Sequence, residues 1–118
     1  MKSILKSIKA VMGMEVDDTS FDDELIIHIN SVLTLKLLQL GIGPETGIVI
    51  SSDVETWDQF LSEKEIIILE SVKAYVGLCV KMVFDPPSGS SHMEAMKSAI
   101  DEYEWRLSIQ SSFIKKEE

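Results

Sequence analysis

The sequence predicts a mostly α-helical protein, a small bundle of three long helices with a short N-terminal helix and a long loop that carries one short strand. Three observations support this all-α fold class. Apolar residues recur every three to four positions over most of the chain. Ser-x-x-Glu patterns, which start helices, precede two long apolar stretches. Glycine and proline concentrate in short segments between these stretches, and 118 residues are expected to form one domain, residues 1–118.

A short amphipathic helix is predicted within residues 1–13, because apolar side chains follow helical spacing up to the natural stop at Gly13. Lys2, Lys6 and Lys9 are expected on the opposite side of this helix. A basic helix face could rest on a membrane surface, but the short length and the lack of an aromatic anchor favour docking on its own domain.

The first long helix is predicted to be capped by Thr19 or Ser20 and to run to Gly41. Its apolar residues share one face, and three others fall well outside that face, namely Ile27, Leu35 and Leu38. Lys36 interrupts the main stripe, and we expect its long side chain to carry the ammonium out to solvent.

Residues 41–47 combine three glycines with a proline and predict a turn-rich loop. The following Ile48, Val49 and Ile50 are the one strand candidate. A single strand is not stable alone, so this segment must pair with another part of the chain or with the same segment of a neighbouring subunit.

Ser62 and Glu65 form a predicted capping box that opens the second long helix, and the prolines at 86 and 87 stop it. Apolar residues cover roughly 220° of its circumference, more than one partner helix would hide. This helix is therefore expected to be central or shared between subunits.

Ser91 and Glu94 repeat the capping-box pattern and are predicted to begin the third helix, followed from residue 111 to 118 by a flexible tail. A core face is expected from residues spaced three and four apart, namely Met93, Met96, Ala99, Ile100, Tyr103 and Leu107. Trp105 projects roughly opposite to that face. Either the helix is covered on both sides or Trp105 contacts a partner.

The composition disfavours several classes of function. With 11 basic and 20 acidic residues, the net charge of −9 repels a phosphate backbone, although an acidic surface could line a passage through which DNA slides. The lone Cys79 cannot form an internal disulfide and suits a reducing cytosol. No stretch reaches the roughly 20 apolar residues that span a bilayer.

Candidate catalytic and metal sites are also not expected. His28 and His92 have no second histidine or cysteine at ligand spacing, and the acidic segment 15–24 lacks the alternating ligands of a calcium loop. The glycine-rich loop has no phosphate-binding lysine, and no nucleophile motif occurs. We therefore predict that the protein is not an enzyme and uses no cofactor.

Four segments, in this order and at these separations, resemble the head-tail connector proteins of long-tailed phages and prophages: TSFDDELIIHINSVL (19–33), QLGIGP (39–44), FDPPS (84–88) and EYEWRL (102–107). The resemblance covers about residues 17–110. It implies a small helical subunit of the virion that forms a ring, expected to be twelve-fold, beneath the portal protein at the head-tail junction. The ring would extend the DNA channel, contact the stopper or tail-completion protein, and assemble in the host bacterial cytoplasm.

The family shares no catalytic residue, so the resemblance and the residue positions together suggest contact roles only. The residues predicted to contact the portal are Trp105, Arg106, Leu107, Ile109, Phe113 and Ile114. The residues predicted to contact a neighbouring subunit or the next ring are Ile27, Leu35, Leu38, Ile42, Ile48, Val49 and Ile50.

Other interpretations stay open at this stage. Trp105 could be buried within its own subunit by a bent helix, and the loop at residues 42–54 could be a plain surface excursion of a monomer. The chain could also be a helical adaptor or regulatory module that binds one protein through the Trp105 face. A nucleic-acid-binding protein is a third possibility, which the net charge disfavours.

Overall fold

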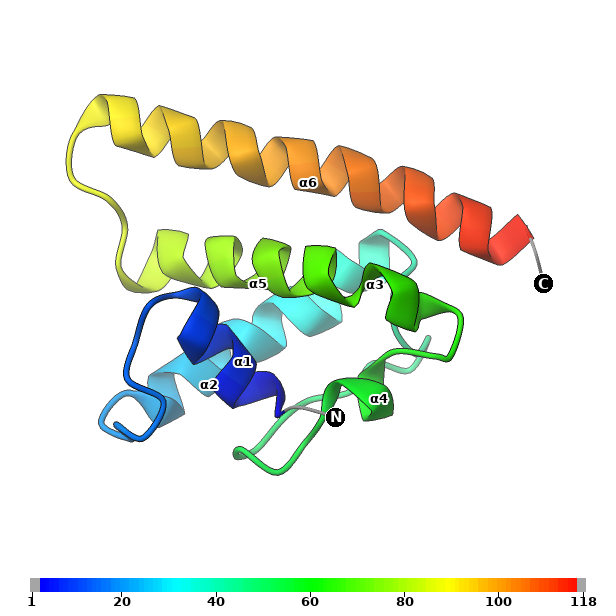
Figure 1. Cartoon of the computed structure of the whole chain (residues 1–118), viewed down its shortest axis with the longest axis horizontal. Coiled ribbons are helices and arrows are strands. Elements are labelled where there is room, and N and C mark those ends of the chain that lie inside the picture. The colour runs from blue at the N-terminus through cyan, green and yellow to red at the C-terminus, as the bar shows by residue number, and fades with distance from the viewer. Residues whose placement is uncertain (1–2, 117–118) are drawn as a thin grey trace.

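The computed structural model describes residues 3–116, and it confirms the mostly α-helical fold (Figure 1). The helices surround a central one, with the long C-terminal helix laid across it. In chain order the elements are α1 (Ile4–Val11), α2 (Asp22–Ser31), the π-helical turn η1 (Val32–Lys36), α3 (Leu37–Gln39), α4 (Trp57–Phe60), the 3₁₀ turn η2 (Glu65–Ile68), α5 (Leu69–Phe84) and α6 (Ser90–Lys116).

Helix α1 docks on its own domain, as predicted. The Ser3 side chain accepts a hydrogen bond from the Lys6 amide and caps the helix, and its apolar face is buried. Lys9 differs from the prediction, because its side chain is buried too. Its ammonium donates to Asp22 Oδ1 at 2.8 Å and to the Asp18 carbonyl, so the acidic start of α2 draws this lysine inward.

The first long helix is continuous through α2, η1 and α3. Neither Thr19 nor Ser20 caps it; the N-cap residue is Phe21, which makes no side-chain capping bond, so that prediction is wrong. The end at Gly41 is as predicted. Gly41, at φ +79°, donates to the Leu38 carbonyl, and the next amide donates to the Leu37 carbonyl, which is the Schellman arrangement.

The π-helical turn η1 explains how the helix accommodates Lys36, which interrupts the apolar stripe in the sequence. A π turn holds more residues than an α turn, so Leu37 follows Leu33 on the buried side and Lys36 is displaced from it. The Lys36 side chain is half exposed, and its ammonium lies 3.9 Å from Glu104 on α6.

Residues 48–50 do not form a strand, and residues 3–116 contain none beyond an isolated bridge between Ser3 and Thr56. The side-chain amide of Asn30 takes the place of a partner strand. Its oxygen accepts from the Ile50 amide at 2.7 Å, and its nitrogen donates to the Ile50 carbonyl at 2.9 Å. The polar groups of Ile50 are thereby satisfied within the subunit.

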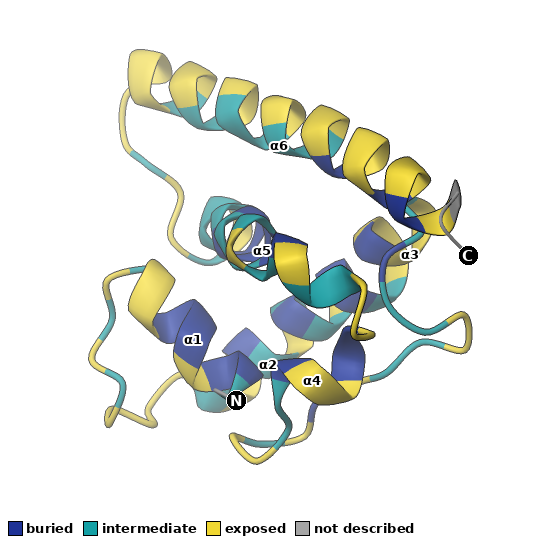
Figure 2. Cartoon of the chain, turned by 45° about the vertical axis from the view of Figure 1, so that its right-hand side comes forward, coloured by how far each residue is buried: buried dark blue, intermediate teal, exposed yellow. Residues whose placement is uncertain are grey.

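Helix α5 is central, as predicted, and packs against α1, α2, η1, η2 and α6 (Figure 2). The capping box is present: Ser62 Oγ accepts from the Glu65 amide, and the Glu65 carboxylate accepts from the Ser62 amide. The short helix α4 was not predicted; it buries Trp57 completely.

Helix α6 begins at Ser90, so Ser91 lies inside the helix and the predicted second capping box does not form; the Met93 amide donates to the Gly89 carbonyl instead. Residues 111–116, which the sequence assigns to the tail, continue this helix. Ser111 and Ile114 are buried there, and the Ser111 hydroxyl donates to the Gly41 carbonyl. Residues 117–118 lie outside the described residues.

Candidate interaction surfaces

An apolar stripe runs along the outer side of the C-terminal half of α6. Trp105, Ile109 and Phe113 are spaced four residues apart and so share one helix face. All three are exposed, Trp105 to 65%. Arg106 lies beside the stripe and pairs with Glu102 at 2.8 Å. Figure 2 shows this outer side of α6 as a continuous exposed band.

Two of the predicted portal contacts face the other way. Leu107 and Ile114 are buried in the core and hold α6 on the body of the subunit. Their side chains are therefore not part of the surface. We define the α6 face by the four exposed predicted residues: Trp105, Arg106, Ile109 and Phe113.

A second group of exposed apolar residues belongs to the first long helix and the loop after it. It contains Ile27, which is 67% exposed, together with Leu35, Leu38 and Val49. We call these four residues the α2 face. Figure 2 shows α2, which carries Ile27, and α6 on opposite sides of α5. Leu38, at the end of the first long helix, instead lines a cavity together with Ser111 and Ile114 of α6.

The other three residues predicted for this contact lie inward. Ile42 is buried because it follows the Gly41 turn back over Leu37, and Ile50 is buried where Asn30 holds it. Ile48 is half-buried and packs against the core. The α2 face is thus smaller than the sequence predicted.

Ile67, one of the apolar residues that follow Ser62 and Glu65, is not covered by the subunit. At 81% it is the most exposed large apolar side chain among the described residues. It lies in the 3₁₀ turn η2, whose geometry differs from that of α5, and the Ile66–Ile68 run gave no signal of that turn.

A polar junction fastens α6 to the two helices beneath it. The Tyr75 hydroxyl donates to Glu104 Oε2 at 2.8 Å, and Lys36 approaches the same oxygen. Burial, followed by the hydrogen bond to Glu104, raises the pKa of Tyr75 well above its usual value. Burial likewise raises the pKa of the neighbouring Cys79 thiol, which makes it a poor nucleophile.

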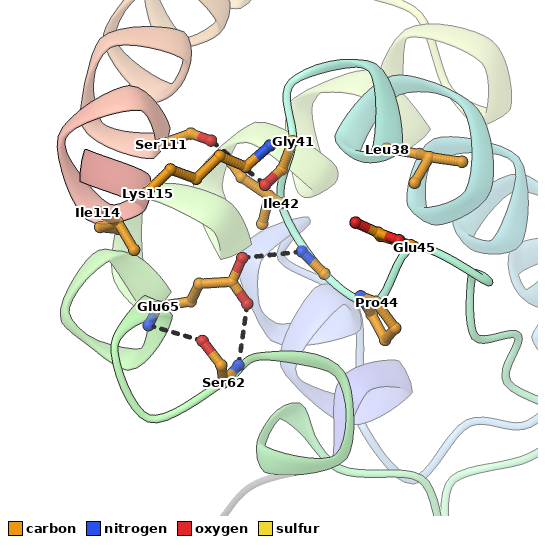
Figure 3. Close-up of a pocket in the computed structure, with 11 residues that line it drawn as sticks. Leu38, Gly41, Ile42, Pro44, Glu45, Ser62, Glu65, Ser111, Ile114 and Lys115 are labelled. Atoms are coloured by element: carbon orange, nitrogen blue, oxygen red, sulfur yellow. Dashed lines mark hydrogen bonds between the residues drawn. The ribbon is translucent and has the colours of Figure 1, made fainter. Parts of the chain in front are cut away.

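A cavity of about 350 Å³ lies where the end of α3, the glycine loop, the start of η2 and the end of α6 meet (Figure 3). The Glu65 carboxylate in its wall accepts hydrogen bonds from the Gly43 and Ser62 amides, at 3.0 and 2.9 Å. Glu65 thus holds the loop against the start of η2. Within residues 3–116, no cluster of three histidine, cysteine or acidic residues could hold a metal ion.

A family model described as phage connector protein matches residues 4–112. No curated protein and no solved structure matches the chain. In the described part of the chain, no helix combines the length and apolar character needed to cross a membrane.

Proposed function

Because the chain belongs to the phage connector protein family, whose members are structural components of the virion, we propose that it forms a ring beneath the portal at the head-tail junction. The ring, expected to be twelve-fold, extends the DNA channel and joins the portal to the stopper or tail-completion protein. Assembly takes place in the cytoplasm of the host bacterium.

The observation that carries the proposal is the presence of two groups of exposed apolar side chains on one small subunit, one on α6 and one on the first long helix and the loop after it. A subunit of a ring that docks on the portal needs a contact surface for other copies and another for the portal. Large apolar side chains gathered on a surface are typical of contacts with other proteins.

The two faces receive different roles in this proposal. The α6 face contacts the portal, with Trp105 as its main contact residue, since tryptophan and arginine are enriched among residues that dominate binding energy. The α2 face contacts the neighbouring subunit or the next ring. The net charge of −9 suits a channel through which DNA passes without being held.

The proposal is tested with purified protein and purified portal, by light scattering and negative-stain images. Rings, alone or on the portal, are the expected result. A protein that stays monomeric and does not bind the portal contradicts the proposal. A saturable one-to-one complex with a single partner protein favours a helical adaptor instead.

Trp105→Ala tests the role of the α6 face. Because Trp105 is largely exposed, we expect its loss to change the free energy of unfolding by no more than about 0.5 kcal/mol. Portal binding should weaken more than about tenfold, as for an anchor residue. Ile67→Ala is the matched control, because Ile67 is exposed but belongs to neither face. Equal portal binding by the wild type and by Trp105→Ala would show that Trp105 is not part of the contact.

A further inference from the structure

The two halves of α6 are attached to the rest of the subunit very differently. We call Ser90–Tyr103 the arm and 104–116 the anchor. Among the residues of α6 whose burial is described, the buried ones are Leu107, Ser111 and Ile114, all in the anchor. The arm contains none, and no residue from 85 to 106 is buried.

The apolar side of the arm is only partly covered. Ile100 and Tyr103, at its end, pack against the core. Met93 and Met96, which continue the same stripe, are half-buried and do not belong to the residues packed on the core. The first two turns of α6 therefore contribute no fully buried apolar side chain, and apolar burial stabilises them less than it stabilises the anchor.

Polar contacts do not compensate for this. Among the described residues, no hydrogen bond or ion pair joins positions 86–103 to another helix. The first such contact along α6 is that of Glu104 with Tyr75. The next is the bond from Ser111 to the Gly41 carbonyl. All of the side-chain hydrogen bonds that fasten α6 thus belong to the anchor.

The connection between α5 and the arm adds little restraint. It consists of residues 85–89, which are mostly exposed, and Gly89 has a φ of +91° with open space around its Cα. Segments with few buried apolar contacts and few cross-links open at a small fraction of the free energy of global unfolding.

We propose that the arm separates from α5 in the folded subunit while the anchor stays in place, with Glu104 at the boundary. Opening uncovers the half-buried Met93, Met96 and Ile100 together with Met82 at the end of α5. The subunit thereby has a third apolar surface that becomes fully accessible when the arm is lifted. This motion belongs to the isolated subunit and does not depend on the ring or the portal.

Pulsed electron-spin distance measurements test the proposal on the full chain with Cys79→Ala as background. One spin-label pair joins Glu70→Cys on α5 to Glu94→Cys on the arm. The matched control joins Glu70→Cys to Ser112→Cys on the anchor. All three labelled positions are exposed, so the labels displace no core residue. Excess unlabelled protein removes distances between subunits.

We expect a broad or two-peaked distance distribution for the arm pair and a single narrow one for the anchor pair. Equally narrow distributions overturn the proposal. Amide hydrogen exchange of the unmodified chain gives a second measurement, in which arm amides should exchange about tenfold or more faster than those of 107–114. Equal protection of both halves also overturns it. Neither result bears on ring formation, so the two proposals fail separately.

Discussion

Replacing Lys9 by methionine tests whether the buried ion pair between α1 and the start of α2 holds these helices together. The Lys9 side chain is 2% exposed, and its ammonium reaches the Asp22 carboxylate and the Asp18 carbonyl. Methionine keeps most of the buried stem, so the change removes the charge and its hydrogen bonds while leaving the packing largely intact.

The expected loss of stability depends on the surroundings of the Asp22 carboxylate once Lys9 no longer pairs with it. Removing one partner of a fully buried ion pair costs about 3–5 kcal/mol. Asp22 retains some access to water, its side chain being 23% exposed, so its carboxylate can be partly rehydrated. We therefore expect Lys9→Met to lower the free energy of unfolding by about 2–3 kcal/mol.

Urea unfolding followed by far-ultraviolet circular dichroism measures the effect. The matched control is Lys6→Met on the same helix, because Lys6 and Asp53 form an exposed pair at 3.5 Å, and its cost should stay within about 0.5 kcal/mol. In a double-mutant cycle with Asp22→Asn, the two changes should cost about 1–2 kcal/mol less together than their sum. Equal costs for the two lysines, or strict additivity in the cycle, would refute the reasoning.

Three further predictions concern other contacts. Gly43→Ala should lower the free energy of unfolding in urea by about 2 kcal/mol or more, because the added Cβ would overlap the Phe60 ring at a φ of +89°. Gly89→Ala, with a similar φ and open space, should lower it by about 1 kcal/mol, and equal losses would contradict this. Asn30→Leu should lower the free energy of unfolding by about 2–3 kcal/mol and remove the hydrogen-exchange protection of the Ile50 amide. Retained protection would show that the Asn30 side-chain amide is dispensable. The raised pKa of Tyr75 means that the unfolded chain loses this proton first. The contribution of Tyr75 to stability should therefore be fully present below about pH 10 and be lost above it, so the alkaline fall in stability should be smaller in Tyr75→Phe; identical alkaline profiles would count against it.

Periodicity and capping patterns predicted most of the helical elements, because they depend on neighbouring residues. The start at Ser62 and Glu65, the stop at Gly41 and the central position of α5 all follow from such local signals. The pattern at Ser91 misled because a helix can begin one residue earlier when the Gly89 carbonyl accepts the first bond.

Features that depend on contacts distant in sequence could not be predicted. Lys9 has the spacing of a solvent-facing lysine, and only the folded chain brings Asp22 to it. The Ile-Val-Ile run has strand propensity, but the side chain of Asn30, twenty residues earlier, satisfies Ile50 instead of a partner strand. Lys36 did signal an irregularity, although nothing in the stripe identified it as a π turn.

Helical periodicity also indicated some of the exposed residues of the candidate surfaces. Helical spacing places Ile27, Leu35 and Leu38 outside the buried stripe, and all three are exposed. Trp105 also lies outside, as its position opposite to Leu107 indicated. Ile42, predicted to contact another subunit, is buried within its own, and turn residues have no periodicity from which that burial could be inferred.

The anchor on α6 has a consequence for the order in which the chain folds on the ribosome. Among the described residues, Leu107 and Ile114 are the last core residues to be translated, and they belong to the helix that covers one side of α5. Until they emerge from the exit tunnel, that side of α5 stays open to water and to other nascent chains. The last step of folding must therefore follow synthesis of the anchor, and a ribosome stalled before it would display an incomplete, aggregation-prone core.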